Sequence, residues 1–190
     1  MNRAGAFPAI WASGLRNPFS FGISPSTGQV LINDVGFETW EEVNEGKAGK
    51  NYGWPMYEGT AKAEGFQDPL FTFGHSQGNC SIMGGVFYEG AAKLYPSTFQ
   101  GRYLISDYCG GWIRAYDPKN FSNPIALVTG GVNAFVAMAL GPDGMIYFLE
   151  RNSNDVGAVK ATNQGTLSRV GYTGTNAPRI SIQPQDQTVV

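Results

Sequence analysis

Short apolar runs follow one another along the chain, each bounded by Gly, Pro, Asn or Asp. Five of them have the length and the β-branched or aromatic content typical of strands: Val30–Asn33, Gly85–Tyr88, Arg102–Ser106, Trp112–Tyr116 and Met145–Leu149. No stretch keeps an apolar residue at every third or fourth position over the length of a helix. The pattern therefore predicts an all-β protein of short strands and tight turns.

Three of the runs share one form. Gly28 opens GQVLIND, Gly101 opens GRYLISD and Gly144 opens GMIYFLE, each with a turn glycine, an apolar centre and an acidic exit residue. The interval between the last two matches one four-stranded propeller blade of roughly 40 to 50 residues. The longer interval between the first two predicts an inserted loop between Gly36 and His75. At this repeat length the chain holds about half of a six-bladed ring.

The repeat character ends after Tyr172, where a segment punctuated by proline begins. We expect residues 1–172 to belong to the propeller. Residues 173–190 contain one alternating stretch and resemble a linker followed by the first strand of an immunoglobulin-like domain, which implies further domains downstream. A disordered tail is the alternative.

Composition narrows the classes of partner. A net charge of -2 supplies no basic face for phosphate backbones, and no apolar run is long enough to span a bilayer. We therefore expect neither nucleic acid nor a membrane span. The 26 glycines and 13% aromatic residues agree with many turns and strands.

The two cysteines, Cys80 and Cys109, lie at the ends of strands in neighbouring predicted repeats. An even count in a glycine-rich fold of this kind favours a disulfide over two free thiols. A metal site is disfavoured because no two further soft ligands lie nearby in the sequence. A disulfide implies export, so we expect a secreted, periplasmic or cell-surface protein.

The segment GLRNPFSFGISPSTGQVLINDVGFETWEEVNEGKAGKNYGWPMYEGT resembles the glucose/sorbosone dehydrogenase family of soluble quinoprotein sugar dehydrogenases and hedgehog-interacting-like proteins. The similarity continues through CSIMGGVFYEG, FQGRYLISDYCGGWIRAYD and GPDGMIYFLE, and so covers residues 9–172 in order. It implies the C-terminal half of a six-bladed β-propeller of four-stranded antiparallel blades, with the remainder of the propeller upstream. Family enzymes bind pyrroloquinoline quinone (PQQ) and calcium on the propeller axis and oxidise the C1 hydroxyl of sugars, or aldehyde hydrates.

The resemblance places Arg16 and Asn17, in the turn before a strand, at the cofactor. A quinone that carries carboxylates needs cations and amide donors at such positions. Without the resemblance, an asparagine before proline is an ordinary turn starter and the arginine a surface charge.

The resemblance also implies two calcium sites. The carbonyls of Gly36 and Phe37 face the calcium of the cofactor, and Glu42 and Tyr52 belong to a second, structural site. The chemistry agrees, because calcium prefers oxygen ligands and a glycine lets the backbone aim its carbonyls inward. The alternative is a solvated acidic loop whose side chains splay outward, with Asp34 capping a turn.

No catalytic residue is expected in this chain, because the family's base is a histidine upstream of residue 1. The one histidine, His75, is of a kind more often found at the surface or in a hydrogen-bonded packing role. Quinone-binding relatives place a lysine in the segment that matches SDYCGGW and an arginine pair just before GPDG. Residues 108–110 and 132–138 are neutral or apolar here, which leaves PQQ binding open.

Two functions from different classes follow. The first is a PQQ-dependent, calcium-binding dehydrogenase that oxidises a sugar or other small alcohol, favoured by Arg16, Asn17 and the acidic turn. The alternative is a non-catalytic, secreted β-propeller that binds carbohydrate or protein, favoured by the missing cations and by the tail. Whether the protein is an enzyme is left open at this point, because fold alone does not decide it.

Overall fold

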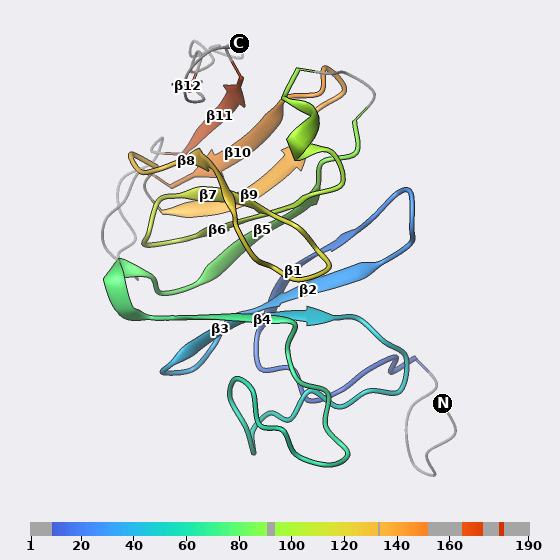
Figure 1. Cartoon of the computed structure of the whole chain (residues 1–190). Helices are drawn as coiled ribbons and strands as arrows, with labels where there is room; N and C mark the ends of the chain where they lie inside the picture. The colour runs from blue at the N-terminus through green and yellow to red at the C-terminus, as the bar shows by residue number, and fades with distance from the viewer. Residues whose placement is uncertain (1–8, 91–93, 133, 152–164, 173–178, 181–190) are drawn as a thin grey trace, which may run out of the picture.

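The computed structural model describes residues 9–90, 94–132, 134–151, 165–172 and 179–180, which form three four-stranded antiparallel sheets (Figure 1). The first sheet contains β1 (Pro18–Ile23), β2 (Val30–Asp34), β3 (Trp40–Glu45) and β4 (Phe71–Gly74). The second contains β5 (Ile82–Phe87), β6 (Tyr103–Asp107), β7 (Ile113–Tyr116) and β8 (Ile125–Val128). The third contains β9 (Phe135–Leu140), β10 (Ile146–Glu150), β11 (Thr166–Gly171) and β12 (Arg179–Ile180).

The helical content of the described residues is limited to two short 3-10 turns, Ser76–Gly78 and Ser97–Phe99. None of these residues belongs to a helix long and apolar enough to cross a membrane. The all-β prediction is confirmed.

The three sheets follow one another as blades of a propeller. In each sheet the strands lie in chain order, and the first strand of the second sheet, β5, contacts both β1 and β9. The first strands therefore line the inner side of an arc, and the later strands of each sheet extend outward from it (Figure 1). This arrangement confirms the predicted partial six-bladed β-propeller of four-stranded antiparallel blades.

The repeated glycines occupy equivalent hairpins. Gly28, Gly101 and Gly144 have φ of 73°, 72° and 79°, a left-handed conformation that favours glycine. Each precedes the second strand of its sheet, β2, β6 or β10. The acidic residues that end these strands are all buried: Asp34, Asp107 and Glu150. The internal repeat read from the sequence is confirmed.

Apolar side chains between neighbouring sheets hold the arc together. One cluster joins the first sheet to the second and includes Leu31, Val43, Ile82, Ile105 and Trp112. A second cluster joins the second sheet to the third and includes Leu104, Ile113, Phe135, Ile146 and Phe148. Burial of apolar surface between sheets is therefore what fixes each blade against the next.

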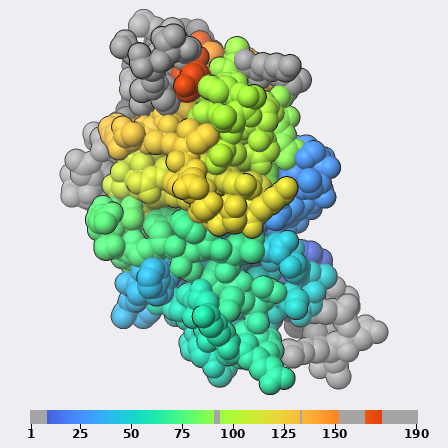
Figure 2. Space-filling view, in the orientation of Figure 1, coloured from blue at the N-terminus to red at the C-terminus, as the bar shows by residue number. Residues whose placement is uncertain are grey.

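The sequence predicts one loop from Gly36 to His75, but the loop in the structure is shorter. Two strands of the first sheet, β3 and β4, lie within the predicted range. Strand β3 reads WEEVNE, and polar residues fill buried positions on both of its faces: Glu41, Glu42 and Asn44. This burial hides the strand from an analysis of hydrophobic pattern. The inserted loop is residues 46–70, which protrude beyond the first sheet (Figure 2).

Part of the C-terminal tail belongs to the third sheet. Residues Arg179–Ile180 form β12, which pairs with β11 through Val170 and Gly171. Two residues of the segment expected to form a linker and an immunoglobulin-like strand therefore pair with the third sheet. The rest of 173–190 lies outside the described residues, and the domain boundary at 172 stays a prediction.

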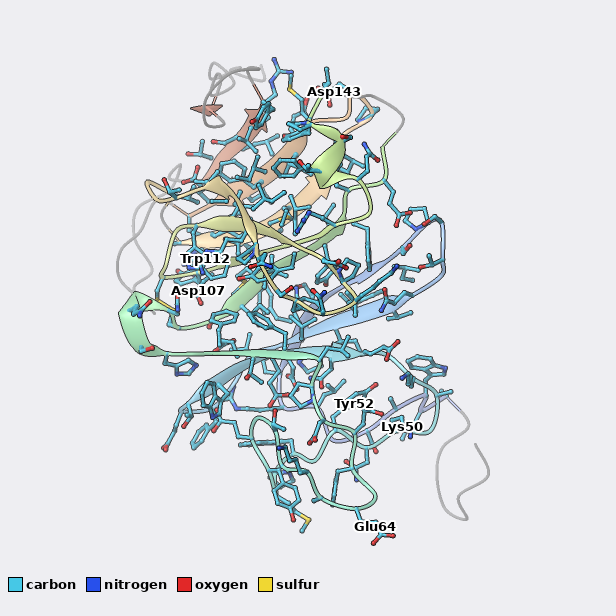
Figure 3. The ribbon with its side chains drawn as sticks, in the orientation of Figure 1. Lys50, Tyr52, Glu64, Asp107, Trp112 and Asp143 are labelled. Carbon is cyan, nitrogen blue, oxygen red and sulfur yellow. A yellow bond between two sulfur atoms is a disulfide. The ribbon has the colours of Figure 1, made fainter. Side chains whose placement is uncertain are left out.

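A disulfide joins Cys80 to Cys109, with their Cα atoms 5.6 Å apart. This pairing was predicted from the even cysteine count and is confirmed. The buried carboxylate of Asp107 lies beside it and accepts amide hydrogen bonds from both cysteines, at 3.1 Å from Cys80 and 2.9 Å from Cys109. Figure 3 shows Asp107 near Trp112, where β6 ends and β7 begins. The disulfide and this carboxylate therefore close the same end of the second blade.

Candidate functional site

A small cavity of about 10 Å³ lies where the turns flanking β1 and β2 meet the 46–70 segment. This is about the space that one water molecule occupies. Four of the six residues expected to bind cofactor or calcium line it: Arg16, Gly36, Glu42 and Tyr52. The other lining residues are Gly14, Asp34, Val35, Trp54, Tyr57 and Glu58. The structure thus brings together most of a site whose residues are spread over 37 positions of sequence, from 16 to 52.

Arg16 supplies a fixed cation at this cavity. Its Nη1 donates hydrogen bonds to the carbonyls of Val35, at 3.0 Å, and Gly36, at 2.6 Å. Its guanidinium carbon lies 5.1 Å from the ring centroid of Phe37 and 5.6 Å from that of Trp54, within range of cation–π attraction. A guanidinium has five N–H donors, so donors remain for a ligand.

Asp34 orients the turn that carries Arg16. Its carboxylate oxygens accept hydrogen bonds from the backbone amides of Arg16, at 2.9 Å, and Asn17, at 2.7 Å. Asn17 is held through its backbone and does not line the cavity, so its contact with a cofactor stays a prediction. Burial raises the pKa of Asp34, although the two amide bonds and the Arg16 charge oppose the rise.

Glu42 is buried with both carboxylate oxygens engaged. One oxygen accepts a hydrogen bond from the Gly59 amide at 2.6 Å, and the other accepts one from Asn44 Nδ2 at 3.0 Å. Burial raises the pKa of Glu42 against these bonds, and the nearby carboxylates of Asp34 and Glu58 add to the rise. Asp34 and Glu42, at 4% and 8% exposed, are thus not splayed outward, whereas Glu38 of the same loop is exposed.

Tyr52 lines the same cavity but directs its hydroxyl elsewhere. The hydroxyl donates to the Glu45 carbonyl at 2.6 Å and accepts from the Lys47 amide at 3.0 Å. Figure 3 places Tyr52 among the loops next to the first sheet. Both residues line one cavity, which is the geometry expected if they bind the same calcium. Their role as calcium ligands stays a prediction.

Glu58 is the cavity residue that sequence reasoning missed. Its Oε1 accepts hydrogen bonds from four successive amides of the turn after β2, those of Phe37, Glu38, Thr39 and Trp40. Phe37 is 56% exposed, and the contact expected between its carbonyl and calcium stays a prediction. No local pattern signals Glu58, because it lies about 20 residues from the turn that it binds.

The donor atoms around the cavity suit a hard cation. They are carboxylate and carbonyl oxygens, the ligands that calcium prefers. Asn44, which bonds Glu42 but does not line the cavity, has a buried Oδ1 without a hydrogen-bond partner in the described part of the chain. The carboxylates at the cavity do not lie close enough together to bind a metal ion by themselves, however. Among the described residues, the group of three acidic, histidine or cysteine ligand atoms within 4.8 Å is Cys80, Asp107 and Cys109, whose sulfurs are disulfide-bonded. A cation at the cavity would therefore rely on carbonyls as well as separate carboxylates.

His75 has the packing role expected of it. Its Nε2 lies 2.5 Å from Oε1 of the fully buried Glu41, whose other oxygen accepts the Ile82 amide at 2.7 Å. Glu41 thus connects β3 to the start of β5 in the next blade. Cys109, in the segment SDYCGGW, is fixed by the disulfide.

Comparisons with known proteins identify relatives of the chain. The sequence profile of the family described as glucose/sorbosone dehydrogenase matches residues 1–159. The aldose sugar dehydrogenase YliI of Escherichia coli is 33% identical over 173 residues, which cover 81% of this chain and 44% of that protein. The HIPL2 protein of Arabidopsis thaliana is 32% identical over 137 residues, covering 61% of this chain and 19% of that protein.

Solved structures share the fold. A glucose dehydrogenase superposes with a TM-score of 0.71 at 23% identity, covering 90% of this chain and 48% of its own. The PQQ-bound aldose sugar dehydrogenase of Streptomyces coelicolor superposes with a TM-score of 0.62 at 21% identity, covering 87% and 47%. The chain spans less than half the length of each of these four relatives. The match over residues 1–159 shows that the chain belongs to the glucose/sorbosone dehydrogenase family.

Proposed function

We propose that the protein is a calcium-binding, PQQ-dependent dehydrogenase that oxidises a hydroxyl of a sugar or other small alcohol. The observation that carries the proposal is the cavity at which Arg16, Gly36, Glu42 and Tyr52 meet. These residues come from four separate elements: the turn before β1, the turn after β2, strand β3 and the 46–70 loop. The cavity itself has room only for an ion, and it is lined by a fixed cation and oxygen ligands, the groups that a quinone carboxylate and its calcium require.

In this proposal Arg16 and Asn17 bind the cofactor and Asp34 holds their turn in place. Two N–H groups of Arg16 are used by backbone carbonyls, so its remaining donors are free to pair with a cofactor carboxylate. Gly36 and Phe37 supply carbonyl ligands to the calcium of the cofactor. Glu42 and the Tyr52 region supply ligands to a second, structural calcium. PQQ, when bound, accepts the two electrons that the substrate hydroxyl loses.

The rest of the active site lies outside this chain in our proposal. The catalytic base comes from the upstream part of the propeller, and further domains follow downstream. We also propose that the protein is secreted, periplasmic or displayed at the cell surface, because the Cys80–Cys109 disulfide needs an oxidising compartment.

Calorimetry on the 190-residue chain tests the calcium part. Calcium that binds only the folded state raises the free energy of unfolding, by about 2.7 kcal/mol at a hundredfold excess over its Kd. We expect this stabilisation with calcium, a smaller one with magnesium, and a weaker calcium effect in Glu42→Gln. Glu38→Gln, an exposed carboxylate of the neighbouring turn, is the matched control. Identical unfolding curves with calcium and with chelator would overturn the calcium site.

A non-catalytic binding propeller is the second candidate. The observation that favours it is the segment SDYCGGW, where the family resemblance implies a cofactor-contacting lysine. Here this segment offers Tyr108, Cys109 and Gly110, and Cys109 is locked in a disulfide. Removing such a charge-assisted bond costs about 1.5 to 3 kcal/mol. Titration of the calcium-loaded chain with PQQ, followed by tryptophan fluorescence, separates the two functions. Saturable quenching that Arg16→Leu weakens supports the dehydrogenase, and its absence supports the binding module.

A further inference from the structure

The turn formed by residues 36–40, here called the amide turn, folds around a carboxylate. Glu58 Oε1 lies 2.9, 3.1, 2.9 and 3.0 Å from the amide nitrogens of Phe37, Glu38, Thr39 and Trp40. Successive amides that converge on one point make a concave binding site for an anion. The amide turn thus has the form of an oxyanion site, and Glu58 occupies it.

The turn closes tightly on this carboxylate. A Cβ added at Gly36 would lie 1.8 Å from the Trp40 carbonyl oxygen and 2.9 Å from Glu58 Oε1, so only glycine fits there. Burial opposes the charge on Glu58, but the four amide donors outweigh it and lower the pKa of this carboxyl. The carboxylate is therefore the stable occupant at neutral pH.

The opposite side of the amide turn faces Arg16. The Gly36 carbonyl accepts a hydrogen bond from Arg16 at 2.6 Å, and the Phe37 ring lies 5.1 Å from its guanidinium carbon. Amides directed at Glu58 and a carbonyl directed at Arg16 belong to the same short turn. Holding one side therefore fixes the other.

Residues 58 and 59 brace two parts of the cavity together. The Gly59 amide donates to Glu42 at 2.6 Å, and the preceding residue, Glu58, accepts the amides of the amide turn. A Cβ at Gly59 would lie 2.8 Å from the Trp40 ring, so this dipeptide is packed closely against the turn.

We infer that the amides of residues 37–40 are a carboxylate-binding site, that Glu58 is its internal ligand, and that this pairing positions the Gly36 carbonyl around Arg16. Glu58 is thus a positioning residue. Its consequence for calcium or cofactor binding rests on the proposed function, whereas the carboxylate site itself does not.

Amide hydrogen exchange by NMR, in calcium-free buffer, tests the inference. We expect Glu58→Ala to speed exchange at residues 37–40 by at least about tenfold, while the amides of β6 keep their protection. Excess sodium acetate should then slow exchange at these four residues again, because a free carboxylate can occupy the site. Sodium chloride at the same ionic strength should not. Acetate rescue separates anion binding from mere packing of the side chain.

Two further variants keep the test decisive. Glu58→Gln retains an oxygen acceptor without the charge, so we expect an intermediate exchange rate. Glu64→Ala, at an exposed carboxylate on the same segment, should exchange as the wild type does. Unchanged exchange in both Glu58 variants, or faster exchange that acetate leaves unaltered, would overturn the inference. If Glu58→Ala does not fold, Glu58→Gln alone decides: an exchange rate at residues 37–40 equal to that of the wild type would overturn the inference. Failure of calcium to stabilise the wild-type chain would instead refute the proposed function and leave this inference standing.

Discussion

The hydroxyl of Tyr103 on β6 lies 3.2 Å from Asn33 Oδ1 on β2, joining the second blade to the first. The same hydroxyl also lies 3.2 Å from the Leu31 carbonyl, so its one hydrogen is shared between these two acceptors. The Tyr103 side chain is completely buried. Asn33 in turn donates to Ser20 on β1 at 3.0 Å. This chain of bonds runs from the second strand of one blade through the first two strands of its neighbour, so it fixes how the blades meet.

Replacing Tyr103 with phenylalanine should therefore destabilise the arc. The ring would still pack, but buried acceptors on Leu31 and Asn33 would lose a donor, at a cost of about 1 to 3 kcal/mol. Urea denaturation measures this difference. Tyr147→Phe is the control, because the Tyr147 hydroxyl bonds a partly exposed carboxylate, that of Asp143, and water can replace it. Equal effects of the two substitutions would contradict a special role for the joint between blades.

Close approach of the same two blades gives a second prediction. A Cβ at Gly22 would lie 2.5 Å from the Gly85 carbonyl oxygen and 2.9 Å from the Tyr103 ring. Gly22→Ala should overpack this contact and cost about 1 to 3 kcal/mol. Gly130→Ala is the control, because nothing lies within 4 Å of its added Cβ. Thermal unfolding of both variants checks the prediction, and a neutral Gly22→Ala would mean that the blades are farther apart than described.

Local patterns were enough to predict the fold class and the repeated hairpins. Gly28, Gly101 and Gly144 each precede an apolar run, and a left-handed glycine before a strand is a local signal. Strand β3 could not be found in this way, because its buried polar residues are satisfied from distant segments. Glu41 bonds the Ile82 amide and Glu42 the Gly59 amide.

The candidate site also contains residues that could be predicted from the sequence and one that could not. The resemblance named Arg16, Gly36, Glu42 and Tyr52, which the structure gathers at one cavity. Glu58 was missed, because only the folded chain brings its carboxylate to the amides of residues 37–40. A contact across such a separation leaves no periodic or spacing signal in a single sequence.

Reduction of the disulfide should lower the stability of the second blade. The bond closes a loop with a sequence separation of 29 residues, worth about 3 to 4 kcal/mol by the chain-entropy account. We expect a reductant to lower the Tm of the wild-type chain, by about 2 to 4 °C per kcal/mol. The variant with both Cys80→Ser and Cys109→Ser should unfold at this lower temperature and be indifferent to reductant. A Tm of the wild type that reductant does not change would show that the bond contributes nothing.

Buried carboxyls should make stability fall as pH rises above the ordinary carboxyl pKa of about 4. Burial raises the pKa of four carboxyls despite their hydrogen bonds: Asp34, Glu41, Glu42 and Asp107. Between the unfolded-state pKa, about 4, and the raised value, the folded chain binds more protons than the unfolded chain. The free energy of unfolding therefore decreases as pH rises through this window. Glu58 and Glu89 have lowered pKa values, so their contribution is lost only as pH falls below about 4.5.

Thermal unfolding in chelator across pH 5 to about 8 should thus show the Tm declining toward the alkaline side. Glu41→Gln should flatten this decline, because it removes one buried charge while keeping the side-chain shape; the exposed Glu38→Gln should leave the slope unchanged. Calcium should flatten the decline too, since a cation at the cavity favours the ionised forms of Asp34 and Glu42. A Tm that rises with pH in chelator would mean that the hydrogen bonds to these carboxylates outweigh their burial. A slope that calcium does not alter would count against a cation beside Glu42.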